Sequence, residues 1–464
     1  MTLAPGIESA LRGVVGGSRL KTDRDSLAHY GRDTCDMFES APSAVVFPDS
    51  SEEVRDIVLL ANEHGFALVP SGGRTGLSGG ATASNGEVVI SLERMNRVLE
   101  ANATDRTVRC QAGVTTARLH QKARELDLHY PVDFAATGSS HIAGNIATNA
   151  GGTRVIRYGM TRNWVGGLEV VTGSGEILEL GRGLIKDNTG YELQQLFIGS
   201  EGTLGIITEA TLRLTRVPAE SAVMVLGLTR LQDLLPVLGA FQARLTLNAF
   251  EFFTEDALAR VIERHGLQRP FAIATPVYAL VDFEAGSEIE LENALRAYEH
   301  CREGGWVSDA TISQSHGQAQ AMWRLRDDIS ETLSRWSPYK NDLSVRISLV
   351  PEFLSEVSGV VAEVYPDFEV LWYGHIGDGN VHLNILKPEK MALEEFKAHC
   401  AKVSERIFEK TQAFGGSVSA EHGVGLLKKP YLAYSRPQQQ IVLMRTIKQA
   451  LDPNGVMNPG KIFE

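Results

Sequence analysis

The sequence predicts an α+β protein of more than one domain, and two patterns carry this prediction. In the first hundred residues, short apolar runs alternate with segments whose apolar residues recur at helical spacing. After residue 217, apolar strands alternate with long helical segments, which is typical of an antiparallel sheet with helices against it. Because 464 residues exceed what one core normally serves, we predict domains at residues 1–217, 218–411 and 412–464.

The elements of the first domain follow from local signals. Residues 45–47 are predicted to form a strand, and Ser50 with Glu53 forms a capping box that begins a helix. Apolar residues at helical spacing follow, and Gly65 ends the helix. Residues 66–70 are predicted to form a second buried strand, which runs directly into a glycine-rich segment.

Three glycine-rich loops stand out, at residues 71–80, 138–152 and 199–205. Such glycine density costs backbone entropy and offers no packing in return. Consecutive N–H groups in a loop of this kind form a concave nest for anions, to which Arg74 can add a charge. The sequence contains neither a GxGxxG that opens a helix nor a GKS or GKT phosphate loop. A single loop would be a tight surface turn, but three predict a long polyphosphate ligand held by backbone.

The second domain is predicted from longer periodic segments. Residues 221–228 and 271–282 have the pattern of strands. The predicted helices of this domain and of the C-terminal segment cover residues 231–245, 288–303, 393–411 and 438–451.

Residues 372–384 predict a β-hairpin around a tight Gly-Asp-Gly-Asn turn. The hairpin can bring His375 and His382 to one side, where two neutral imidazoles can hold a metal ion. A third ligand candidate, Glu421, lies beside His422 in a turn bounded by glycine. Each histidine alone would more simply be a structural residue, so the metal prediction depends on the whole set.

Composition and charge exclude several classes of function. The formal net charge of −12 argues against a nucleic-acid partner, because basic patches are missing. We find no apolar run that would span a bilayer and no secretory signal at the N-terminus. Four scattered cysteines form no CxxC pair, which fits a reducing compartment. We therefore expect a cytoplasmic protein.

Several short motifs resemble the vanillyl-alcohol-oxidase/p-cresol-methylhydroxylase superfamily, in its branch of FAD-linked 2-hydroxyacid dehydrogenases. The resemblance covers nearly the whole chain. It implies a two-subdomain FAD-binding domain of the p-cresol-methylhydroxylase type, an α+β cap with an antiparallel sheet, and a C-terminal helical segment that returns to the FAD domain. The motifs are residues 70–79, 145–152, 157–159, 198–206, 375–382 and 421–425.

The resemblance also implies which residues line FAD, with the pyrophosphate on the loop 71–80 and the isoalloxazine facing the cap. Members with covalent FAD use a histidine or cysteine in these loops. Here Thr75 follows Arg74, so we expect noncovalent FAD. The implied cofactor residues are Pro70, Ser71, Gly72, Gly73, Arg74, Thr75, Gly76, Leu77, Gly79, Gly138, Ser139, Gly144, Asn145, Thr148, Asn149, Gly151, Gly205, Ile206 and Asn458.

The chemistry of 2-hydroxy acid oxidation assigns roles to the histidine set. The hydroxyl proton must leave while hydride leaves C2, and a divalent metal lowers the pKa of the hydroxyl by several units. A histidine near its ordinary pKa can then accept the proton. This division assigns His375, His382 and Glu421 to the metal and His422 to general-base catalysis. The donor set favours Zn²⁺, although cobalt, manganese and iron also suit it.

Within the branch, residues 323–326 and 339–344 resemble those of the D-2-hydroxyglutarate dehydrogenases. The departure is Asn341, where an aromatic residue is usual. The resemblance implies oxidation of D-2-hydroxyglutarate to 2-oxoglutarate, with electrons passed to an external acceptor such as electron-transfer flavoprotein or a quinone. Related enzymes are often dimers, so a homodimer is compatible with it.

Two cations support a dicarboxylate substrate. Arg326 offers a bidentate fork and Lys340 a point charge, and a monocarboxylate would need only one of them. By resemblance, Ser330 and Asn384 add hydrogen bonds to the substrate. The alternative is that one of the two cations, above all Lys340, forms a surface ion pair, because Asp327, Asp328 and Asp342 are their neighbours in sequence.

Other functions remain open at this point. The nearest is a D-lactate or broad-specificity D-2-hydroxyacid dehydrogenase on the same scaffold. A metallohydrolase would use the two histidines and Glu421 with a bound water, the glycine loops then being structural. A catalytically silent flavin-binding or electron-carrier subunit is a third class.

Overall fold

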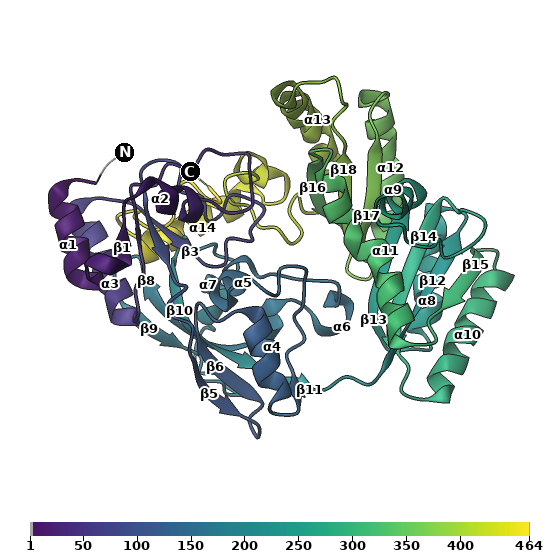
Figure 1. The fold of residues 1–464 in the computed structure, drawn as a ribbon, viewed down its shortest axis with the longest axis horizontal. Coiled ribbons are helices and arrows are strands. Elements are labelled where there is room, and N and C mark those ends of the chain that lie inside the picture. The colour runs from purple at the N-terminus through teal and green to yellow at the C-terminus, as the bar shows by residue number, and fades with distance from the viewer. Residues whose placement is uncertain (1–2, 464) are drawn as a thin grey trace. The chain divides into compact units, whose positions relative to one another are not determined.

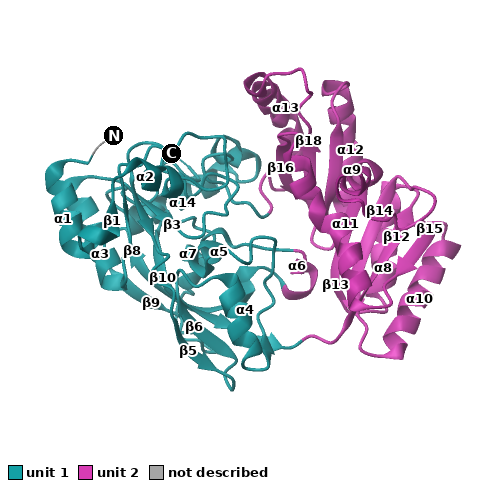
Figure 2. Cartoon of the chain, in the orientation of Figure 1, with its two compact units in different colours: residues 1–152, 159–217, 421–464 teal, residues 153–158, 218–420 magenta. Residues whose placement is uncertain are grey.

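The computed structural model describes residues 3–463, which form two compact units (Figure 1 and Figure 2). Unit 1 comprises residues 1–152, 159–217 and 421–464, and unit 2 comprises residues 153–158 and 218–420. Unit 1 is thus built from three stretches of chain, the last of which follows unit 2. No helix in residues 3–463 is long and apolar enough to cross a membrane.

Unit 1 contains a four-stranded sheet in the order β1-β2-β4-β3. Strand β4 pairs in parallel with β2 and β3, and β1 pairs antiparallel with β2 at the edge. Parallel strands need buried faces, and every residue of β2 and β4 is buried. The strands are β1 Leu20–Lys21, β2 Ala44–Val46, β3 Leu68–Ser71 and β4 Val88–Ser91.

The helix predicted after Ser50 is α3, Ser51–His64. The Ser50 hydroxyl accepts from the N–H of Glu53 at 3.3 Å, and Gly65 ends the helix in the left-handed region with φ 69°. Of the two hydrogen bonds of the predicted capping box, only the one to the Ser50 hydroxyl forms. The Glu53 carboxylate instead accepts from Arg19 at 2.6 Å and from the backbone N–H of Asp49 at 2.7 Å, because a guanidinium is the stronger partner.

A five-stranded antiparallel sheet, β5-β6-β10-β8-β9, completes the scaffold of unit 1. Apolar side chains of both sheets and of the adjoining helices form one continuous core. The strands are β5 Val98–Asn102, β6 Thr107–Gln111, β8 Val165–Thr172, β9 Ile177–Leu180 and β10 Gly205–Arg213, with a small pair β7 Leu128–His129 and β11 Thr215–Arg216. The other helices of unit 1 are α1 Pro5–Val15, α2 Arg24–Tyr30, α4 Thr116–Arg124, α5 Ile142–Thr148, α7 Gln194–Phe197 and α14 Gln438–Leu451.

One prediction for unit 1 is wrong. We expected residues 138–152 to form a loop without packed apolar residues, but helix α5 lies within it. Ile142 and Ile146, four residues apart, are buried in the core of unit 1. Asn149 then ends the helix in the left-handed region with φ 50°. Two isoleucines at helical spacing therefore outweigh the small polar residues around them.

Unit 2 is built on a seven-stranded, wholly antiparallel sheet, as predicted for this part of an α+β protein. Its strand order is β15-β12-β14-β13-β17-β18-β16, so β13 lies at the centre. The strand expected at residues 271–282 begins later, at Val277, because Phe271 is buried against the Tyr278 ring outside the sheet. The strands are β12 Ser221–Leu228, β13 Leu247–Thr254, β14 Val277–Glu284, β15 Val307–Ile312, β16 Tyr339–Ser344, β17 Val370–His375 and β18 Asn380–Ile385.

Helices of unit 2 lie against this sheet. Helix α11 packs on β12, β13 and β14, and the short α6 packs on β13. Apolar residues of α11 share a core with the sheet face that also carries Leu371 and Tyr373. The helices are α6 Val155–Tyr158, α8 Leu234–Gln242, α9 Glu255–His265, α10 Glu288–Glu303, α11 His316–Ser334, α12 Val350–Val364 and α13 Leu393–Ala413.

Candidate active site

The predicted hairpin is formed by β17 and β18, with Tyr373 paired to His382 and His375 paired to Asn380. Paired residues of an antiparallel sheet share a face, as do residues two apart on one strand. His375, His382 and Asn384 therefore lie on one face. Glycine is required in the turn, because Gly379 has φ 83° and a Cβ there would meet the Val345 carbonyl at 2.1 Å.

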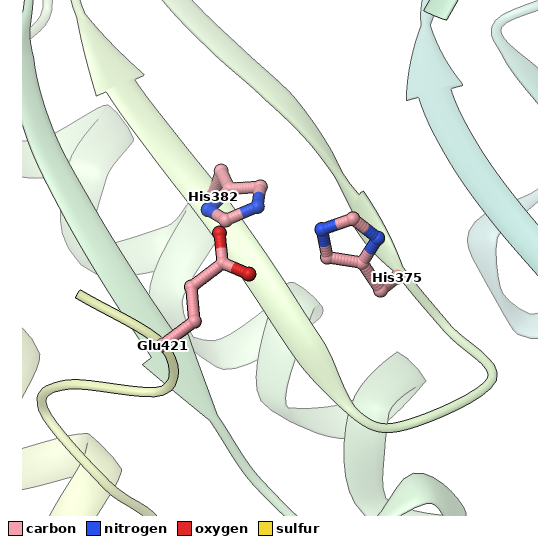
Figure 3. A group of neighbouring side chains, drawn as sticks. All are labelled: His375, His382 and Glu421. Atoms are coloured by element: carbon pink, nitrogen blue, oxygen red, sulfur yellow. The ribbon is translucent and has the colours of Figure 1, made fainter. Parts of the chain in front are cut away.

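Two imidazoles and one carboxylate come together beside this hairpin (Figure 3). His375 and His382 are 6% and 7% exposed, and their ring centroids are 5.2 Å apart. Glu421 directly follows Ala420, the last residue of unit 2, and its carboxylate lies with the two histidines so that all three ligand atoms are within 4.8 Å of one another. Two nitrogens and one oxygen at this spacing fit a divalent ion such as Zn²⁺.

Two buried carboxylates stand behind the histidines, each 1% exposed. Glu251 of β13 is paired in register with His375, whose Nδ1 lies 2.8 Å from Glu251 Oε1. Asp342 of β16 is paired with His382, and the closest nitrogen–oxygen distance is 3.6 Å. Asp342 also accepts from the backbone N–H of Ala420 at 3.1 Å, so it holds the chain just before Glu421.

The two predicted substrate cations come from different elements. Arg326 of α11 is 5% exposed and donates from Nε to Glu251 at 2.9 Å. Its guanidinium also lies over the Tyr373 ring, 4.8 Å from the centroid. Lys340 of β16 is half-buried and donates from Nζ to the Ser330 hydroxyl at 3.2 Å. The alternative of a surface ion pair does not describe Arg326, which is held by a buried acid.

Asn384 has the properties of a ligand-binding residue. It is 1% exposed and pairs with Lys340 in the sheet, so the two side chains share a face. Within residues 3–463, neither the oxygen nor the nitrogen of its amide has a hydrogen-bond partner. An unsatisfied buried amide costs about 1–3 kcal/mol, which a bound polar ligand would recover. Asn341, on the opposite face, is unsatisfied among these residues in the same way.

The turn that carries Glu421 and His422 is clamped by Glu201 of unit 1. The Glu201 carboxylate is buried and accepts from the N–H groups of Val424 and Gly425, both at 2.7 Å. Burial raises the pKa of Glu201 to about 7, against the opposing effect of these two bonds. His422 Nε2 lies 3.4 Å from Glu421 Oε1, so the residue predicted as the base and the residue predicted as the third metal ligand are neighbours.

The three glycine-rich loops of unit 1 meet one another. A Cβ on Gly73 would lie 2.1 Å from the Ser139 carbonyl, and one on Gly202 would lie 3.0 Å from the Pro70 ring. Asn458, near the C-terminus, joins two of the loops, because its side-chain amide donates to the carbonyls of Gly80 at 2.9 Å and Glu201 at 2.7 Å. Backbone segments that approach so closely can bind a polyphosphate through their N–H groups. We call the three loops, residues 71–80, 138–152 and 199–205, the glycine cradle.

Some predicted cofactor side chains are already engaged within the protein. Arg74 lies 3.0 Å from His29 Nε2 and over the Tyr30 ring. The Asn145 amide donates to the Thr116 hydroxyl, and the Thr148 hydroxyl donates to the Gly144 carbonyl. The Asn149 side-chain oxygen accepts from the backbone N–H of Arg162. The Ile206 side chain is buried in the core. A contact between FAD and these side chains would therefore compete with bonds and packing that they already make within the protein.

Other polar atoms in the cradle fit a bound cofactor. Ser71 Oγ, His141 Nδ1 and Asn458 Oδ1 are buried, and no described residue bonds to them. His141 lies against Gly72, where a Cβ would be 3.3 Å from the histidine Cβ. Buried polar atoms without protein partners normally mark a ligand or water position. The donors and the tight glycine contacts therefore fit FAD.

The structure adds residues that the sequence analysis did not single out. Glu251 is a lone acid in the apolar run Ala249–Phe253, a signal that was available. Glu201 and His141 lie inside recognised glycine motifs, where their polar side chains were unexplained. Asp342 was considered only as a charge neighbour, because its pairing with His382 depends on strand register.

Comparisons with known proteins agree with this geometry. The family of FAD linked oxidases, C-terminal domain, matches residues 217–462, and an FAD binding domain matches residues 42–181. A D-2-hydroxyglutarate dehydrogenase of Stutzerimonas stutzeri (strain A1501) is 56% identical over 459 residues, 99% of each chain. The mitochondrial enzyme of that name from Bos taurus is 37% identical over 98% of this chain and 83% of its own. A p-cresol methylhydroxylase structure shares the fold, with a TM-score of 0.80 at 17% identity over 99% of this chain and 97% of its own.

Proposed function

The chain belongs to the family of FAD-linked oxidases that contains the D-2-hydroxyglutarate dehydrogenases, and from this membership we propose that it oxidises D-2-hydroxyglutarate to 2-oxoglutarate. It is an FAD-dependent dehydrogenase, as its relatives at 54–56% identity over nearly the whole chain indicate. The proposal concerns the substrate, the metal, the acceptor and the roles of individual residues.

One observation supports this substrate best. On one face of the unit 2 sheet, and on the helix against it, His375 and His382 adjoin two cations and an unsatisfied amide. A dicarboxylate carries one negative charge at each end, and Arg326 and Lys340 can each form a charge-assisted hydrogen bond with one of its carboxylates. D-lactate has a single carboxylate, so it would form a charge-assisted bond with only one of the two cations.

The cofactors are assigned by the groups that fit them. Bound FAD, noncovalent in our proposal, supplies the acceptor for the hydride that leaves C2 and is held in the glycine cradle of unit 1. A divalent ion, Zn²⁺ in our proposal, is assigned to His375, His382 and Glu421 and supplies Lewis-acid assistance to loss of the hydroxyl proton.

The remaining steps belong to side chains of the protein. His422 accepts the hydroxyl proton on an imidazole nitrogen. Arg326 and Lys340 hold the two carboxylates, while Ser330 accepts a hydrogen bond from Lys340 and so orients its ammonium group. Asn384 offers both a donor and an acceptor to the substrate.

The electrons leave through an external acceptor in this proposal. The four cysteines, Cys35, Cys110, Cys301 and Cys400, are buried, form no disulfide and lie at separate places in the chain. They form no ligand set for an iron–sulfur cluster. In this proposal electron-transfer flavoprotein or a quinone would take up the electrons, and bound FAD would supply the redox group that delivers them.

Anaerobic titration of the purified flavoprotein tests the proposed substrate. We expect D-2-hydroxyglutarate to bleach the flavin absorbance faster than D-lactate or D-malate. D-lactate has no distal carboxylate, and the distal carboxylate of D-malate is one methylene group closer to C2. Equal or faster bleaching by D-lactate would overturn the substrate assignment. A colourless protein without flavin absorbance would instead favour hydrolytic chemistry.

A His422→Asn variant tests the proposed base. We expect kcat to fall by about 10²- to 10⁴-fold, the usual contribution of a general base, while the FAD and metal contents stay at wild-type levels. Rapid-mixing measurement of flavin reduction isolates this step from reoxidation. Unchanged reduction in H422N would remove His422 from the mechanism.

A further inference from the structure

The central strand of unit 2 carries one buried acid in an apolar run. Glu251 lies in β13 between Phe250 and Phe252 and is 1% exposed. Burying an ionised carboxylate costs several kcal/mol unless charged or polar partners compensate for the lost water. The partners of Glu251 therefore indicate why the residue is an acid.

The Glu251 carboxylate has two partners, His375 and Arg326. Nδ1 of His375 lies 2.8 Å from both Oε1 and Oε2, and Oε2 also accepts from Nε of Arg326 at 2.9 Å. The carboxylate can only accept at His375, so the imidazole proton sits on Nδ1 and the lone pair on Nε2. One terminal nitrogen of Arg326 lies 3.3 Å from that Nε2, as a lone pair there allows, and this guanidinium N–H would give up the position when an ion binds.

A metal ion requires this tautomer at His375. Histidine ligands generally donate their second ring N–H to a carboxylate or carbonyl, which orients the ring and leaves the other nitrogen free for the ion. The same carboxylate holds the guanidinium assigned to the substrate. Glu251 thus touches both the metal subsite and the substrate subsite without being assigned to either.

We propose that Glu251 is a positioning residue that sets the metal-binding tautomer of His375 and at the same time holds Arg326 in place for the substrate carboxylate. The inference rests on the proposed metal site and gives Glu251 no contact with the reacting atoms.

Glu251→Gln separates the two tasks with almost no change in side-chain volume. An amide has one acceptor oxygen where the carboxylate has two. The buried guanidinium takes that oxygen, because charge-assisted hydrogen bonds are the stronger ones. The amide N–H then faces His375 Nδ1, which favours the tautomer with the proton on Nε2 and turns the lone pair away from the metal position.

The test measures Zn²⁺ affinity on metal-stripped, FAD-loaded protein by competition with a chelating dye. We expect E251Q to weaken Zn²⁺ binding by about 10- to 100-fold, the usual effect of removing an outer carboxylate. Asp282→Asn is the matched control. Asp282 is an equally buried acid on the neighbouring strand β14, but it accepts from Asn248 and Trp323 rather than from a histidine of the site. D282N should keep the wild-type Zn²⁺ affinity within about 3-fold.

A double variant supplies a signature that general loss of structure would not produce. In E251Q/R326M the guanidinium is gone, so the amide oxygen returns to the His375 N–H and the Nε2 lone pair is restored. We expect the double variant to bind Zn²⁺ within about 3-fold of R326M alone. This comparison also serves if E251Q by itself folds poorly.

The outcomes separate this inference from the proposed function. If the wild type binds no Zn²⁺, or if His382→Ala binds it equally well, the proposed metal site is wrong. If the wild type binds Zn²⁺, H382A does not, and E251Q binds as tightly as the wild type, the role of Glu251 is wrong. The role of Glu251 is also wrong if Zn²⁺ affinity falls by the same factor from the wild type to E251Q as it does from R326M to the double variant.

Discussion

Among single residues, Lys340 and Arg326 carry similar charges in different settings. Arg326 donates to a buried carboxylate, whereas Lys340 donates to the neutral Ser330 hydroxyl and is only half-buried. Because Arg326 already binds a buried acid beside the histidines, we expect Lys340 to make the larger difference between substrates with one and with two carboxylates.

Lys340→Met should affect dicarboxylates selectively. Loss of a charge-assisted bond to one carboxylate costs about 1.5–3 kcal/mol, so we expect kcat/KM for D-2-hydroxyglutarate to fall by roughly 10- to 150-fold. For D-lactate we expect a change below about 3-fold. Lys387→Met is the control, because Lys387 bonds backbone carbonyls at the end of the hairpin and should leave both values unchanged. Equal losses on both acids would contradict the assignment.

At the scale of elements, the glycine cradle of unit 1 is shaped by loops whose backbones lie close together, and less by contacts between side chains. The loop after β3 and the segment before α5 touch at Gly73 and Ser139, where a Cβ would meet a carbonyl at 2.1 Å. Gly13, in helix α1 of the same unit and outside the glycine-rich loops, has no atom within 4 Å of its added Cβ. The two glycines therefore separate the effect of a backbone contact between the loops from the effect of replacing a glycine as such.

Gly73→Ala should push these two loops apart and weaken FAD binding, whereas Gly13→Ala should leave FAD binding near the wild-type level. A backbone contact this short cannot be relieved by rotating a side chain, so the loops themselves must shift. Flavin release on gel filtration and the fluorescence of released FAD measure the effect. Retention of FAD by G73A at the wild-type level would show that the cradle tolerates the shift.

The sequence predicted regular elements well where the signals were local. Helices α10 and α14 have the predicted bounds, Glu288–Glu303 and Gln438–Leu451, because amphipathic spacing and terminal residues specify them. The hairpin and the face shared by His375 and His382 were predictable for the same reason. The partners behind them were not. Glu251 reaches His375 across 124 positions, through a strand register that no local pattern contains.

For the molecule as a whole, Glu201 makes stability depend on pH. Burial raises its pKa from the ordinary 4.5 to about 7. Between these two pH values the folded protein holds a proton that the unfolded chain has released. The stabilising contribution of Glu201 to the free energy of unfolding is therefore fully present below pH 4.5 and is lost as the pH rises to 7. The loss amounts to about 3 kcal/mol at most.

Glu201→Gln removes this titration. We therefore expect the melting temperature of the variant, relative to wild type, to rise as the pH increases from 4.5 to 7 and to level off above 7. Scanning calorimetry of the FAD-loaded proteins at closely spaced pH values measures the difference. Parallel pH profiles for the two proteins would mean that Glu201 titrates in its ordinary range.

The three-stretch construction of unit 1 has a consequence for biosynthesis. Residues 421–464 are translated after the whole of unit 2, and they include Asn458, which joins two of the glycine loops. A ribosome that has reached residue 420 has therefore made every strand of both large sheets but has not made the residue that closes the cradle. We therefore expect stable flavin binding only after Asn458 has been made, when every strand of the two large sheets has already been synthesised.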